Sequence, residues 1–130
     1  MNFDKTKFVL HAGLAFGAFH HFIYNPYKAG SLHGVGATVK AGLAGLFTVH
    51  ELKLAKADAE SSPTLCKLAA PFDAAGAAVT GALAKIKGGK ATDQDINGVS
   101  SAVDAVQNDS KADGVAVPDQ VPSDGQLASG

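Results

Sequence analysis

The strongest constraint on the fold is a long apolar run near the start of the chain, residues 8–24, FVLHAGLAFGAFHHFIY, which contains no Asp, Glu, Lys or Arg. A helix of this composition has almost no polar face, because residues 8–19 offer only His11 to water. The run must therefore be covered, either by other parts of the protein or by lipid.

A second apolar segment follows a polar loop at residues 25–34. Asn25 and Pro26 favour the end of the first helix there, since proline lacks an amide donor. Residues 35–52, VGATVKAGLAGLFTVHEL, predict a second apolar helix, which continues as a charged segment to Glu60. Residues 1–60 are therefore predicted to form a hairpin of two apolar helices.

Residues 61–90 predict a third helix, amphipathic in character, between Thr64 and Lys87. Its larger apolar side chains recur at alternating steps of three and four residues, which is typical of a helix that packs on a partner. Pro71 predicts either a kink or a new helix start, and Gly88 with Gly89 ends the helix. The stripe consists of Leu65, Leu68, Phe72, Ala75, Val79, Ala82 and Ile86.

Residues 91–130 form the acidic part of the chain. Thr92 and Asp95 have the spacing of a capping box, which predicts a short fourth helix at residues 93–107. The Asp, Ser, Gly and Pro beyond residue 108 predict a disordered tail. Because the alternation typical of strands is missing, the predicted fold class is all-α.

Charge and composition exclude several classes of protein. The net charge is +2 over residues 1–60, +3 over 61–90 and −6 over 91–130. All eleven basic residues are lysine, and the absence of arginine argues against a nucleic-acid reader. Cys66 is the only cysteine, and the sequence has no Walker loop, GxSxG or HExxH motif. A non-enzymatic protein is therefore expected.

The length and flanks of the two apolar segments favour a membrane hairpin. About 20 residues are needed to cross a bilayer, and these segments are only slightly shorter. Lys5, Lys7, Lys53 and Lys56 would lie on one side and Lys28 on the other. The positive-inside rule then predicts a cell-membrane protein with both termini in the cytoplasm. The alternative is a soluble or exported helical bundle of the cell envelope, with residues 8–24 as a retained helix or a cleaved signal.

The five histidines form two predicted layers along the hairpin. One layer contains His11 and His50, and the other, about 13 Å away at 1.5 Å per residue, contains His20, His21 and His33. Such layers are typical of axial ligands to haem b, or of ligands to a transition metal. A redox or metal-binding membrane subunit in electron transfer is therefore the alternative function.

A packing role for the histidines requires fewer assumptions, and it is the interpretation that we favour. Gly13 and Gly17 have the GxxxG spacing that lets a neighbouring helix approach closely, and His20 shares their face. The other histidines would lie near water or lipid headgroups. No cofactor is expected on this interpretation.

The predicted function is that of a small membrane accessory, scaffold or assembly subunit that works through helix–helix packing. Its expected partners are membrane lipid and either further copies of itself or a larger membrane complex. The predicted contact residues on the third helix are Leu65, Leu68, Phe72 and Val79.

Overall fold

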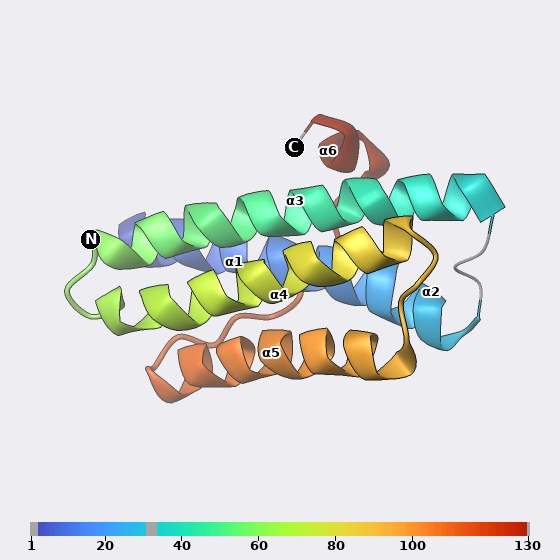
Figure 1. The fold of residues 1–130 in the computed structure, drawn as a ribbon. Coiled ribbons are helices and arrows are strands. Elements are labelled where there is room, and N and C mark those ends of the chain that lie inside the picture. Colours follow the sequence, from blue (N-terminus) through green and yellow to red (C-terminus); the bar gives the residue numbers. More distant parts are fainter. Residues whose placement is uncertain (1–2, 31–33, 130) are drawn as a thin grey trace.

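The computed structural model describes residues 3–30 and 34–129, and every regular element in these ranges is a helix. The all-α prediction is therefore confirmed. The four long helices are α1 (Phe3–Phe19), α3 (Gly34–Glu60), α4 (Ala69–Lys87) and α5 (Asp93–Ala112) (Figure 1). The short elements are the π-helical turn η1 (His20–Tyr24), α2 (Asn25–Lys28), the 3₁₀ turn η2 (Cys66–Leu68) and α6 (Asp124–Ser129).

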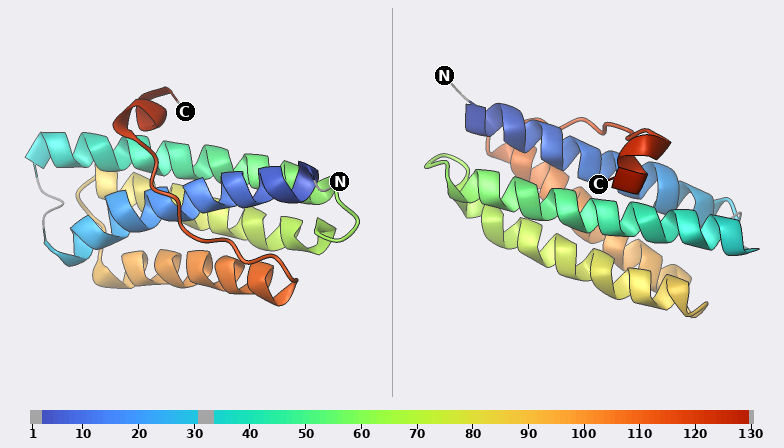
Figure 2. Two further views of the ribbon diagram at one scale, coloured as in Figure 1. Left: turned by 180° about the vertical axis from the view of Figure 1, so that it is seen from behind. Right: turned by 90° about the horizontal axis from the view of Figure 1, so that it is seen from above.

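The long helices lie side by side as a bundle. Helix α3 packs on both α1 and α4, and α5 packs on α4 (Figure 1). The two apolar helices thus do contact each other, but as members of a four-helix arrangement. Residues 113–123, named here the C-terminal arm, leave α5 and cross α1 on the rear of the molecule, and α6 then lies against α3 (Figure 2).

The core contains the apolar side chains of all four long helices. The Phe72 ring of α4 lies 5.1 Å from the ring of Phe8 and 6.0 Å from that of Phe16, both in α1. These three side chains are almost completely buried, as is Ile96 of α5. Most of the apolar surface of α1 is therefore covered by protein.

The first helix does not stop at Asn25 and Pro26 as the sequence suggests. It passes through the wider turn η1, in which the Asn25 amide donates to the His20 carbonyl, and continues as α2. A proline clashes with the carbonyl four residues earlier and leaves it without a partner. Local widening to a π-turn accommodates this proline without breaking the helix.

The third helix starts later than the predicted Thr64, whereas the predicted start of the fourth helix is confirmed. Helix α4 begins at Ala69, so Pro71 lies in its first turn, where backbone amides need no intrahelical acceptor. Thr92 and Asp95 form the capping box at the start of α5, although the helix continues to Ala112 instead of ending near residue 107.

The predicted location in the cell membrane is wrong. Within residues 3–30 and 34–129, no helix combines the length and the apolar character that crossing a bilayer requires. Helix α1 has 17 residues, three of which are Asp4, Lys5 and Lys7. Helix α3 is longer, but its glycines and alanines contribute little hydrophobicity, and Lys40 and Glu51 interrupt it.

The tail also differs from the expectation of disorder. Val115 and Val117 of the arm and Leu127 of α6 are buried. These side chains pack on the surface of the other helices, so a segment with few apolar residues still contributes to the core.

Candidate functional site

The structure forms two separate histidine–carboxylate sites. In the first, His11 Nδ1 of α1 lies 2.6 Å from Asp58 Oδ2 of α3, with 23% and 17% of the two side chains exposed. A carboxylate only accepts hydrogen bonds, so Nδ1 carries the proton and donates it. This contact joins the two helices of the predicted hairpin.

Glu51 of α3 lies beside this first site. Only 8% of the residue is exposed, and its Oε2 atom has no hydrogen-bond partner among the residues that the structure describes. Burial raises the pKa of the Glu51 carboxyl above its ordinary value. The nearby charges of His11 and His50 oppose this increase, and the charge of Asp58 adds to it, but burial has the largest effect. His11 and His50 therefore both act on one buried carboxyl, at the level where the sequence placed them together.

The second site joins η1, α5 and the arm at His20. Nδ1 of His20 lies 2.6 Å from Asp119 Oδ2, and Nε2 lies 3.1 Å from Asp104 Oδ1. The second oxygen of Asp119 accepts from Gln107 Nε2 at 2.9 Å, and the same amide nitrogen donates to the Val117 carbonyl at 2.8 Å.

Both ring nitrogens of His20 face hydrogen-bond acceptors, so both contacts form only when each nitrogen carries a proton. Only the doubly protonated imidazolium can donate to Asp104 and Asp119 at once, because the neutral ring has a single N–H. His20, Asp119 and Gln107 are named here the arm latch, since they connect the arm to the helices beneath it.

The four histidines that the structure describes are not gathered into one ligand set. His21 is exposed and contacts the Phe22 ring at 4.7 Å between centroids, and His50 is exposed on α3. His33 lies outside the described residues. Across the described part of the chain, no group of three or more His, Cys, Asp or Glu side chains has a geometry suited to a metal ion. Nothing in this geometry favours the haem or metal alternative.

Gly13 and Gly17 allow another segment to pack closely on α1, as predicted, but this segment is the arm and not a helix. A Cβ atom on Gly17 would overlap the Gln120 carbonyl oxygen, and one on Gly13 would lie 2.8 Å from the Pro118 oxygen. The Gln120 amide donates to the Gly13 carbonyl at 2.9 Å. The two glycines of the GxxxG spacing therefore form the surface of α1 on which the backbone of the arm packs.

The predicted contact stripe of the third helix lies inside the bundle. Its four residues are between 0% and 3% exposed, so none is available to a partner. They are Leu65, Leu68, Phe72 and Val79.

An exposed apolar stripe is found on α3 instead. Val39, Leu43 and Leu46 have 56%, 39% and 57% of their surface exposed, and their spacing of four and three residues puts them on one face. Named here the α3 stripe, they come from a segment that the sequence indicated only as a uniformly apolar helix. The α3 stripe is exposed because α1 and α4 cover the other faces of α3. No local sequence pattern specifies which faces of a helix its neighbours cover.

Comparison with protein-family models, with curated proteins and with solved structures finds no match to this chain. Fold and site together define an all-α helical bundle whose N-terminal helix is covered by a C-terminal arm.

Proposed function

We propose that this protein is a non-enzymatic assembly protein that associates with a second copy of itself through the α3 stripe. The observation that carries the proposal is the exposure of Val39, Leu43 and Leu46 in a row on one helix face. Residues spaced in this way act as anchors when one helix docks against another. Association removes them from water, which is favourable by about 25 cal/mol for each Å² of apolar surface.

The charges beyond the stripe favour an antiparallel pair of α3 helices. His50 and Lys53 follow the stripe on the exposed side of the same helix. A parallel pair would place Lys53 against Lys53 of the second copy, which is unfavourable. An antiparallel pair centred between residues 42 and 43 places Val39 against Leu46 and keeps the two lysines apart. Lys40 does not obstruct this face, because its ammonium lies 5.1 Å from the centre of the Phe22 ring.

The stripe is small, so the association should be weak and dependent on concentration. Stable complexes bury about 1,200–2,000 Å² in total, and three partly exposed side chains from each copy contribute less than that. Such an interface suits reversible assembly.

Sedimentation velocity over a wide concentration range tests this function. The unmodified protein should shift from monomer to dimer as its concentration rises, and Leu46→Glu should weaken the dimer at least tenfold. The matched control is Leu10→Glu on α1, since Leu10 is also exposed, at 45%, but lies outside the α3 stripe. A protein that stays monomeric throughout, or a dimer that Leu46→Glu leaves unchanged, would refute the proposal.

A further inference from the structure

Helices α3 and α4 pack tightly along one part of their contact and leave a hollow along another. At Gly45 of α3 the helices are tight, because a Cβ atom there would lie 2.7 Å from Leu83 of α4. Gly76 lies two turns earlier on α4, and a Cβ atom on it would meet nothing within 4 Å. The missing side chain at Gly76 therefore leaves a hollow between the helices.

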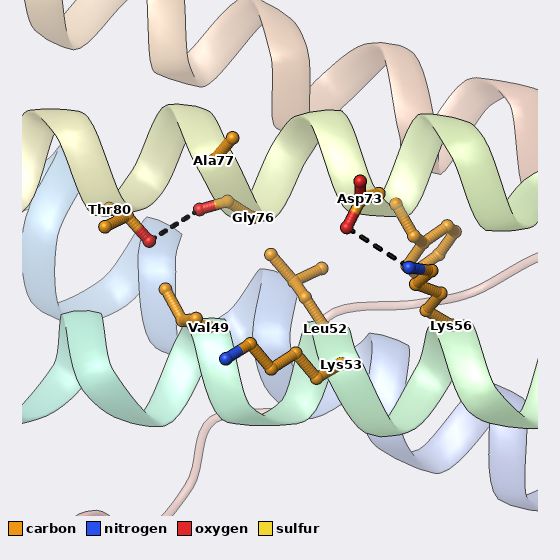
Figure 3. Close-up of a pocket in the computed structure, with 9 residues that line it drawn as sticks. Val49, Leu52, Lys53, Lys56, Asp73, Gly76, Ala77 and Thr80 are labelled. Atoms are coloured by element: carbon orange, nitrogen blue, oxygen red, sulfur yellow. Dashed lines mark hydrogen bonds and ion pairs between the residues drawn. The ribbon is translucent and has the colours of Figure 1, made fainter.

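This hollow is a groove of about 230 Å³ with an apolar floor and a polar rim. Leu52 and Phe72, both buried, and the half-buried Val49 form the floor. Figure 3 shows Val49, Leu52, Lys53 and Lys56 of α3 on one side of the groove and Asp73, Gly76 and Thr80 of α4 on the other. The volume corresponds to about eight water-sized groups, at about 30 Å³ each.

The charges on the rim favour a monoanion. Lys56 lies 3.3 Å from Asp73, whose side chain is largely exposed, while Lys53 pairs with no carboxylate within the described residues. One ammonium group thus remains without an opposite charge at the edge of an apolar floor. Asp73 disfavours a second negative charge on any ligand, because like charges repel at short range.

We propose that this groove binds a short aliphatic monocarboxylate, with its carboxylate at Lys53 and its hydrocarbon chain over Leu52 and Gly76. The apolar floor supplies favourable burial and the ammonium selects the charge, a combination typical of small-molecule sites. A ligand of about eight heavy atoms fits the volume and should bind with a Kd on the order of 1 mM. No residue of the α3 stripe lines the groove, and the antiparallel pair keeps the two Lys53 side chains apart, so the groove and the assembly can be tested separately.

An NMR titration with hexanoate tests the site. The signals of Val49, Leu52 and Thr80 should shift and saturate, whereas hexanol should bind about tenfold more weakly and hexylamine should cause no saturable shift. Lys53→Gln should lower the affinity for hexanoate to that for hexanol. Gly76→Leu fills the groove and should abolish binding.

Gly81→Leu is the matched control for the filled groove. Gly81 lies on the same helix, a Cβ atom on it would also meet nothing within 4 Å, and it lines a different hollow. Binding should survive this change, and also Leu46→Glu, which separates the result from the test of assembly. Unsaturable shifts, unchanged binding in Gly76→Leu, or equal affinity for hexanol and hexanoate would overturn the proposal.

Discussion

At the scale of single residues, Glu51 is the side chain whose surroundings suit its charge least. It is buried between α1 and α3 with one carboxylate oxygen unpaired among the described residues, and burial raises its pKa above the ordinary 4.5. The folded protein therefore binds this proton more tightly than the unfolded chain does. The stabilising contribution is complete below the ordinary pKa and is lost as the pH rises through the higher folded-state value.

Glu51→Gln should consequently stabilise the protein at neutral pH. We expect a gain on the order of 1 kcal/mol, since an unpaired buried charge is costly, and the gain should disappear once Glu51 itself is protonated in acid. Urea denaturation of both proteins at several pH values measures this. Glu60→Gln, an exposed change on the same helix, should stay within about 0.5 kcal/mol of the unmodified protein. A pH-independent difference for Glu51→Gln would contradict this interpretation.

At the scale of elements, the arm is held to the bundle by polar contacts around His20. His20 faces Asp104 of α5 and Asp119 of the arm, and the rings of Phe19 and Tyr24 pack beside it. Removing either carboxylate leaves one His20 N–H without its acceptor, so the arm should then separate more readily from the bundle.

Asp119→Asn tests the arm latch directly. The amides of residues 115–121 should exchange with solvent several-fold faster, after correction for intrinsic rates, because charge-assisted bonds are about twice as strong as neutral ones. Asp109→Asn, on an exposed residue of α5, is the control and should leave this exchange unchanged. Identical exchange in Asp119→Asn and the unmodified protein would refute the arm latch.

Local sequence patterns predicted where the helices begin and end better than they predicted which helices contact each other. Thr92 and Asp95 indicate the start of α5, because a capping box is made within one turn. Gly88 and Gly89 likewise indicate the end of α4. The continuation of the first helix past Pro26 was not predictable from propensity alone, since it depends on a π-turn that propensity rules do not include.

The candidate sites depend on residues distant in sequence, which explains why they were missed. Asp119 lies 99 residues after His20, and Asp58 lies 47 after His11. The only sequence signal was the charge imbalance, with an acidic tail available to pair with histidines elsewhere. Gly13 and Gly17 did indicate that another segment packs closely on this helix. A glycine pair does not specify whether that segment is a helix or an extended arm.

At the scale of the whole molecule, Phe72 connects the bundle. Its ring contacts Phe8 and Phe16 across the α1–α4 interface, and it also closes the floor of the groove. The periodic stripe of α4 correctly indicated packing against a partner. Periodicity alone does not distinguish a partner inside the chain from one outside it, and burial in the bundle identifies the partner here as the chain itself.

Phe72→Ala should therefore destabilise folding and not merely assembly. Removing a buried phenylalanine costs about 3–5 kcal/mol, a large part of the 5–15 kcal/mol that stabilises a typical domain. Thermal unfolding followed by circular dichroism measures the loss. Leu46→Ala, an apolar truncation on the exposed α3 stripe, should change stability by no more than about 0.5 kcal/mol. A Phe72→Ala protein as stable as Leu46→Ala would place Phe72 outside the core.

The path of the arm also fixes an order of events during synthesis. Helices α1 and α3 can pair once both have emerged from the ribosome, but the glycine face of α1 gains its cover only when residues 118–120 follow. Nascent chains that have not yet reached the arm display this face to water and to chaperones. Translation of residues 118–120 is thus the step that covers the glycine face of α1.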